Sequence, residues 1–108
     1  MQTWNLAELD LQPHHPQVLT TDKEARVIAI QLPAGEQMQE HRTYERAYMV
    51  VISGRIQVNG EEKVSGGAGF LAEFDPREDR EISASEDSRL LLFLGPWPGT
   101  GHPSNPGT

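Results

Sequence analysis

The sequence predicts an all-β protein, built as a barrel or sandwich of short antiparallel strands. Short runs rich in β-branched and aromatic residues alternate with turn signals along the chain. No segment has a convincing helical period of 3.6 residues. Ten glycines and eight prolines among 108 residues supply the many turns that such folds need. A chain of this length fits one domain with one small core.

The N-terminal segment, residues 1–25, is expected to cover the barrel rather than to form its wall. The prolines on both sides of His14-His15 exclude a continuous strand or helix there. Val18-Leu19 favours only a short strand before the turn at residues 21–23. The three histidines outside the central region, His14, His15 and His102, are interpreted as exposed or turn residues, because a loop histidine lacks the supporting contacts of a metal ligand.

Most of the predicted strands lie between residues 26 and 94. Arg26–Leu32 is apolar on both faces, residues 37–41 alternate with one polar face, and Arg46–Ser53 is rich in β-branched and aromatic residues. The pair Asn59-Gly60 predicts a tight hairpin, because both residues tolerate positive φ. The remaining expected strands are residues 55–58, 61–64, 70–74, 80–84 and 89–94, with a bend at Gly66–Gly69.

The C-terminal tail, residues 95–108, is dense in proline and glycine and predicts no regular element. It nevertheless contains Trp97, and disordered segments are poor in aromatic residues. We therefore expect the start of the tail to dock on the barrel or on a neighbouring subunit.

The bulk composition excludes several classes of partner. A net charge of −7 argues against nucleic acid or an anionic membrane surface, since both require a basic patch. The absence of cysteine excludes disulfides and thiolate metal sites. The N-terminus has neither the basic region nor the apolar run of a signal peptide, and no apolar stretch is long enough to span a membrane. We expect a cytoplasmic protein.

A spaced motif lies in residues 35–54, GEQMQEHRTYERAYMVVISG. It resembles the first signature of the cupin superfamily: glycine, five residues, His-x-His, three or four residues, glutamate, six residues, glycine. Every interval fits. His41 occupies the first histidine position, but Thr43 and Ala47 stand where the second histidine and the glutamate are expected.

The second cupin signature is more degenerate. Counted from Gly69, its histidine falls on Arg80, and its proline arrives one residue late as Pro76. The resemblance covers residues 26–94. Within the superfamily, the sequence resembles the small single-domain bacterial cupins. It implies a cupin-type β-barrel, or jelly roll, of two packed antiparallel sheets.

The resemblance also implies a metal site, which these residues do not support. In cupins the two histidines, the glutamate and the later histidine bind a divalent metal. Here only His41 of the four positions is a good ligand, and Arg80 places a fixed cation among them. We therefore expect no metal cofactor. The alternative is a divalent transition metal bound by an atypical set of His41, Glu45 and Glu73. The opposing interpretation, which we favour, is that Glu45 is a solvated turn residue and no metal ligand.

If these positions point into the barrel, they form a candidate ligand pocket. Its residues are His41, Thr43, Ala47, Met49 and Arg80. A guanidinium and a hydroxyl between apolar walls suit a small molecule, for which an anionic group is the best match. The opposing interpretation is that Arg80 faces solvent and pairs with a neighbouring carboxylate, from Glu78, Asp79 or Glu81.

An enzyme is the alternative to a binding protein. Many cupins are metal-dependent dioxygenases or isomerases, and an atypical ligand set could retain that chemistry. Metal-free cupin epimerases use histidine with tyrosine or aspartate as acid and base, for which His41 with Tyr44 or Tyr48 is the candidate pair here. The sequence leans against catalysis and identifies no substrate.

Strand Arg46–Ser53 is apolar on both faces, which indicates burial on both sides. One side can face the barrel interior and the other a second subunit. We therefore expect a homodimer, in which Trp4 or Trp97 helps to cover the interface. The opposing interpretation is that the N-terminal segment covers the same chain.

Overall fold

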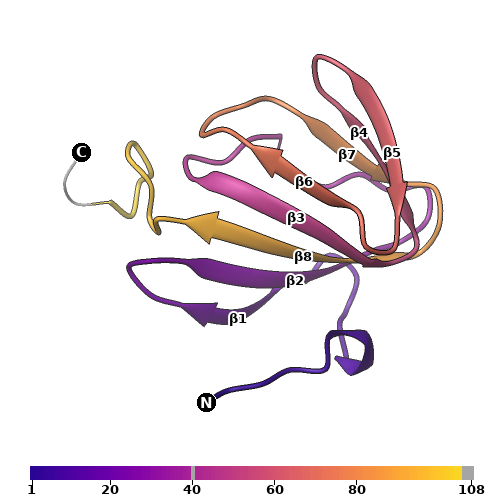
Figure 1. The fold of residues 1–108 in the computed structure, drawn as a ribbon, viewed down its shortest axis with the longest axis horizontal. Coiled ribbons are helices and arrows are strands. Elements are labelled where there is room, and N and C mark those ends of the chain that lie inside the picture. Colours follow the sequence, from indigo (N-terminus) through magenta and orange to yellow (C-terminus); the bar gives the residue numbers. More distant parts are fainter. Residues whose placement is uncertain (40, 106–108) are drawn as a thin grey trace.

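The computed structural model describes residues 1–39 and 41–105, which form two antiparallel sheets (Figure 1). The larger sheet has the strand order β1-β2-β8-β3-β6 and the smaller one the order β5-β4-β7. The strands are β1 (Gln17–Thr21), β2 (Arg26–Leu32), β3 (Arg46–Ser53), β4 (Arg55–Asn59), β5 (Lys63–Gly67), β6 (Leu71–Phe74), β7 (Glu81–Ala84) and β8 (Ser88–Gly95). The predicted all-β fold of two packed antiparallel sheets is therefore confirmed.

The core lies between the two sheets and comes from every second residue of the strands. Val51 on β3, Leu90 on β8 and Ile82 on β7 are among its fully enclosed members. Successive side chains of a strand point to opposite faces, so alternation selects one inward set from each strand. β3 and β8 are central strands of the larger sheet, which explains why their sequences are apolar on both faces.

The N-terminal segment packs on the outer face of the larger sheet of its own chain. A short 3₁₀ helix, η1 (Leu6–Glu8), precedes Leu11, which is buried against Ala29 and Leu91. β1, at residues 17–21, is longer than the expected strand and forms the edge of the sheet itself. Residues 1–25 thus combine a covering segment with one strand of the larger sheet.

Two expected elements differ from the structure. The segment 37–41 is not a strand: Gln37 makes a single bridge to Ser83, and bends at Gln39 and His41 interrupt the ladder. Glu40, in the same predicted strand, lies outside the described residues. The segment still runs beside β7, because the Met38 N–H donates to the Ile82 carbonyl at 2.9 Å.

The predicted two-residue hairpin is also wrong in length. Asn59 pairs with Lys63, so residues 60–62 form the loop and β5 extends to Gly67. The ladder can include Gly66, whose missing side chain leaves room for the Phe70 ring. The bend therefore occurs later than the glycine run suggests, near Gly69, whose φ is 88°.

Gly54, the last glycine of the first motif, is required by the backbone. Its φ is 90°, and a Cβ there would lie 2.6 Å from the Ser88 Cα. L-residues rarely adopt this conformation. The motif glycine thus permits the tight connection of β3 to β4. No helix in the described part of the chain is long and apolar enough to cross a membrane.

Candidate functional site

Three residues of the first motif are buried: Thr43, just before β3, and Ala47 and Met49 on β3. The shared parity of Ala47 and Met49 along the strand turns both to the same face. The Thr43 hydroxyl donates to the Glu45 carbonyl at 3.0 Å, which satisfies it locally. Ala47 and Met49 belong to the core cluster between the sheets. These three positions are therefore filled by packed side chains.

Arg80 also points inward, which decides against the interpretation that it faces solvent. Only 3% of its surface is exposed, and its guanidinium carbon lies 4.7 Å from the centre of the Phe74 ring. Its Nη1 donates to the Glu78 carbonyl at 3.5 Å. The guanidinium thus lies over an aromatic ring inside the structure, an arrangement that its weak hydration permits.

His41 differs from these residues in being exposed. Its side chain is exposed, although its carbonyl accepts a 2.8 Å hydrogen bond from the Arg80 N–H. It lines a wide, open depression at the protein surface. The other residues of that depression are Asn59, Gly60, Glu61, Asp79, Arg80 and Glu81. Of the predicted pocket, Thr43, Ala47, Met49 and Arg80 are buried, and His41 lies outside.

The described residues do not fit the metal that the cupin signature implies. Ala47 offers no donor atom, the Thr43 hydroxyl is engaged, and Arg80 is a fixed cation. The alternative set is not assembled either: Glu45 is buried, whereas Glu73 lies at the surface and pairs with Arg46 at 2.8 Å. Within residues 1–39 and 41–105, no three His, Cys, Asp or Glu side chains are grouped to hold a metal ion.

Glu45 instead fixes the C-terminal tail over one end of the barrel. Its side chain is 2% exposed, and Oε2 accepts a 2.8 Å hydrogen bond from the Gly99 N–H. This contradicts its interpretation as a solvated turn residue. Trp97 packs against the core cluster and under the Arg26 guanidinium, 4.4 Å from the ring centre. The tail therefore docks on its own chain, one of the two expected arrangements.

The two candidate acid–base tyrosines lie apart from the His41 depression. The Tyr44 ring contacts His102 of the tail, with 5.4 Å between ring centres, and stands under Arg77. Tyr48 is exposed on β3, opposite in parity to the inward Ala47 and Met49. Neither tyrosine lines the depression that His41 lines. The structure therefore does not bring the proposed pairs into one site.

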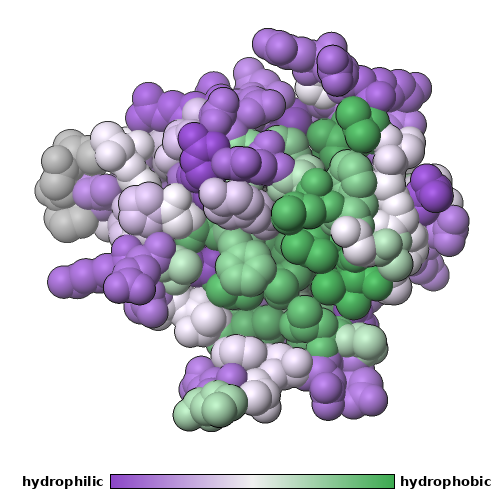
Figure 2. Space-filling model, in the orientation of Figure 1, coloured by the Kyte–Doolittle hydropathy of each residue, from purple (hydrophilic) through white to green (hydrophobic). Residues whose placement is uncertain are grey.

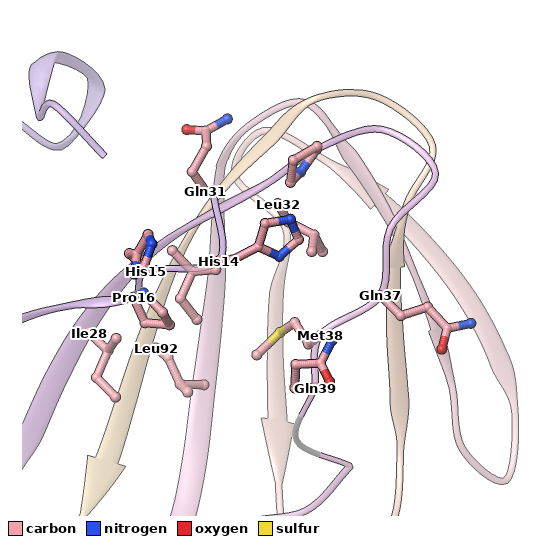
Figure 3. A pocket seen from close by; sticks show the side chains of 12 residues that line it. His14, His15, Pro16, Ile28, Gln31, Leu32, Gln37, Met38, Gln39 and Leu92 are labelled. Carbon is pink, nitrogen blue, oxygen red and sulfur yellow. The ribbon is translucent and has the colours of Figure 1, made fainter. Parts of the chain in front are cut away.

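A different cavity opens between the larger sheet and the segment 37–39, which runs beside β7 of the smaller sheet, and we call it the intersheet pocket (Figure 3). It has a volume of about 320 Å³. Its lining residues are His14, His15, Pro16, Ile28, Ile30, Gln31, Leu32, Pro33, Gln37, Met38, Gln39 and Leu92. Figure 3 shows the His14 ring on one side of the opening and Met38 with Gln39 on the other.

The pocket has apolar walls and a polar rim. β2 and β8 contribute Ile28, Ile30 and Leu92 from the inward face of the larger sheet. His14 is held at the rim by a 3.0 Å contact of its Nε2 with Glu36 Oε1. Its φ of 65° is unusual for a residue with a side chain, and it turns the chain at this point.

Sequence reasoning missed this pocket and treated His14 and His15 as exposed turn residues. Both are solvent-exposed, yet both line the rim. A partial signal was present: Ile28, Ile30 and Leu32 alternate along β2, so their inward direction could be predicted. That the loop carrying His14 lies across these residues depends on the tertiary structure.

Comparison with known proteins identifies the family. The family model for the quercetinase C-terminal cupin domain matches residues 13–93, and the chain therefore belongs to this cupin family. No curated protein matches the sequence significantly.

Solved structures with the same fold include several cupins. An RmlC-like cupin from Desulfovibrio desulfuricans is 16% identical and has a TM-score of 0.77, over 89% of this chain and 97% of that one. An uncharacterised double-stranded β-helix protein from Klebsiella pneumoniae is 18% identical, with a TM-score of 0.76 over 89% and 90%. The Cnp3 cupin domain of Schizosaccharomyces pombe is 14% identical, with a TM-score of 0.75 over 87% and 68%. At these identities the likeness is one of fold.

Proposed function

We propose that this cupin binds a small, mostly apolar molecule with one hydrogen-bonding or anionic end in the intersheet pocket, without the usual cupin metal. The observation that carries the proposal is the pocket itself, an apolar cavity of about 320 Å³ with a polar rim. Such a cavity is at the small end of the range of ligand sites, which are typically apolar with a few placed polar groups.

The apolar walls would supply binding affinity, and the polar rim would orient the ligand. Ile28, Ile30 and Leu92 offer apolar surface, whose burial by a ligand is favourable by roughly 25 cal/mol per Å². The imidazole of His14 and the amide of Gln39 can each donate and accept hydrogen bonds. A ligand with one polar end would therefore enter with that end toward the rim.

This proposal moves the ligand away from the residues that the sequence favoured. Thr43 and Ala47 lie among packed side chains, and Arg80 lies on Phe74. None of the three lines the intersheet pocket. The prediction of a small ligand in a metal-free barrel is retained. The proposed binding site moves from the motif positions to the intersheet pocket.

The methionines allow a direct test by nuclear magnetic resonance. Met38 lines the pocket, Met49 is buried in the core, and Met1 is exposed at the N-terminus. With ¹³C-labelled methionine methyl groups, benzoate and neutral benzamide serve as probes of similar shape. We expect the Met38 signal to shift with saturation in the millimolar range, while Met1 and Met49 stay in place.

A pair of variants locates the binding. Ile28→Phe fills the pocket and should abolish the Met38 shift. Val64→Phe, at an exposed position on the smaller sheet, should leave it unchanged. A preference for benzoate over benzamide would identify the polar end as an anion. An unmoved Met38 signal with both probes at about 10 mM would refute the proposal, and stoichiometric transition metal in protein purified without chelator would refute its metal-free part.

A further inference from the structure

A second groove opens between the edge strands of the two sheets, and we call it the edge groove. β5 ends the smaller sheet and β6 ends the larger one, and residues of both strands line the groove. Its volume is about 350 Å³. The edge groove shares no lining residue with the intersheet pocket, so binding there is independent of the function proposed above.

The floor of the edge groove is apolar and open to solvent. Val64 on β5 stands opposite the buried Val58 in the β4–β5 register, so its side chain points to the inner face of the smaller sheet, yet it is 40% exposed. Phe70 and Ala72, which also line the groove, are only partly buried. These side chains remain accessible because β5 and β6 belong to different sheets and do not pair. A ligand with apolar side chains can bury this surface.

β6 offers an open backbone edge beside this floor. The Val51 N–H donates to the Phe70 carbonyl at 2.9 Å, in register with the β3–β6 ladder. Alternate residues of an antiparallel strand turn their N–H and C=O groups to opposite sides. Leu71 and Glu73 therefore turn theirs away from β3, toward an edge on which no other described strand pairs.

The charges around the groove are predominantly negative. Glu61 and Glu62, in the β4–β5 loop, line it and are exposed, and neither makes an ion pair within the part of the chain that the structure describes. Glu73 lines it too and contacts Arg46 at 2.8 Å. Arg80 also belongs to the lining, but only 3% of its surface is exposed. Figure 2 shows hydrophilic side chains over the tip of the β4–β5 hairpin and hydrophobic ones over the strands below it.

We propose that the edge groove binds a basic, extended peptide segment of another protein, which adds to β6 as a further strand. Peptide residues opposite Leu71 and Glu73 hydrogen-bond to the open edge, and their cationic side chains complement the carboxylates. The residues between them turn to the inner face and place apolar side chains on Val64 and Phe70. The favoured segment therefore alternates lysine or arginine with apolar residues.

A second copy of this chain is the competing occupant, and its charge argues against it. Pairing of two β6 edges would bring the carboxylates of both copies together, including Glu73 on each edge strand and Glu61 in each groove. Like charges placed opposite each other destabilise a strand pair, and each copy has a net charge of −7. A cationic segment of another protein avoids this repulsion.

Amide hydrogen exchange, followed by nuclear magnetic resonance with a synthetic peptide, tests the proposal. The probe is Lys-Val-Lys-Val-Lys with blocked ends, whose binding should saturate below about 1 mM. It should slow exchange of the Leu71 and Glu73 amides by about tenfold or more, because binding protects both N–H groups. The Ala72 and Phe74 amides, which the alternation assigns to β3, should change less.

A modified peptide separates backbone pairing from charge attraction. Methylation of the backbone nitrogens of the lysines keeps the charges and side chains but removes the donors that face β6. The methylated peptide should bind about tenfold more weakly or worse, because several hydrogen bonds are lost. This comparison needs no change in the protein and therefore does not depend on the folding of a variant.

A matched pair of variants locates the binding. Val64→Lys places a cation on the floor of the groove and should weaken binding of the unmodified peptide by about tenfold or more. The control is Val18→Lys on β1, at the far edge of the larger sheet, because Val18 is 39% exposed and the net charge changes equally. Val18→Lys should bind the peptide as the wild type does.

Three outcomes would overturn the proposal. The first is unchanged exchange at Leu71 and Glu73 with about 1 mM peptide. The second is equal affinity for the methylated and unmethylated peptides, which would show charge attraction alone. The third is slowed exchange of these amides with rising protein concentration in the absence of peptide, which would assign the edge to a second copy.

Discussion

Two parts of the same barrel interior, the motif positions around Ala47 and the intersheet pocket beneath His14, use similar strands but differ in packing. At the first, Thr43 and Ala47 are buried, and the tail closes the nearby end through Glu45. At the second, the inward faces of β2 and β8 leave about 320 Å³ open. In this chain, the positions where the cupin signature expects metal ligands on β3 lie in a closed part of the barrel, whereas residues 37–39 of the same signature line the open space.

The largest expected effect lies at the closed end. Glu45→Ala should lower the free energy of unfolding by about 2 to 3 kcal/mol, because the buried Gly99 N–H loses a charged acceptor. Urea denaturation followed by circular dichroism measures this loss. Glu45→Gln, which keeps an acceptor oxygen, should lose less.

The control for Glu45 is Glu73→Ala. Glu73 was grouped with Glu45 in the alternative metal set but pairs with Arg46 at the surface, where ion pairs contribute little. The urea midpoint of Glu73→Ala should stay close to that of the wild type. Equal losses in Glu45→Ala and Glu73→Ala would contradict the role of Glu45 in holding the tail.

A second pair of variants compares the two regions by added volume. Ala47→Leu should cost about 1 to 2 kcal/mol, because the site is fully enclosed and an extra side chain forces its neighbours apart. Ile28→Phe should cost less than about 1 kcal/mol, because its larger side chain can extend into the pocket. Thermal unfolding measures both. The comparison fails if Ile28→Phe is the more destabilising.

The smallest effect concerns the turn between β1 and β2, at residues 22–25. The Glu24 and Ala25 N–H groups donate to Asp22 Oδ1, at 2.8 and 3.1 Å, and these bonds lower the pKa of Asp22. A carboxylate with a lowered folded-state pKa stabilises the protein above its unfolded pKa, and the contribution is lost as the pH falls through the folded value.

Asp22→Asn keeps the acceptor but removes the charge. Its melting temperature should be slightly below that of the wild type at pH 7, and this difference should shrink at about pH 3. Glu61→Gln, in the β4–β5 loop, serves as the control for general loss of charge. A difference between wild type and Asp22→Asn that is the same at both pH values would rule out the turn's contribution.

Most of the fold could be predicted because it depends on local patterns. β2 and β3 begin and end where the β-branched and apolar runs do. The motif spacing predicted the cupin barrel, and the need for glycine at residue 54 follows from its φ of 90°. The failures occurred where register overrides local preference: Gly66 joined a ladder, and the polar alternation of residues 37–41 did not produce a strand.

The candidate site could be predicted only in part. Alternation placed Ala47 and Met49 on one face of their strand, and the cupin resemblance implied that Thr43 points inward. Neither argument tells whether inward side chains leave space. Arg80 is buried against the general preference of charged residues for the surface. The intersheet pocket combines segments far apart in the sequence, and the unusual backbone of His14 is not visible in its residue type.

The position of β8 in the larger sheet has a consequence for biosynthesis. β8 lies between β2 and β3 and hydrogen-bonds to both, although it follows the seven other described strands along the chain. Leu32 finds its partner Ser88 only after translation of the intervening chain, and β3 likewise waits for its central neighbour. The two pairs of the larger sheet, β1–β2 and β3–β6, can therefore join only after β8 has been synthesised, and the facing edges of β2 and β3 lack their partner until then.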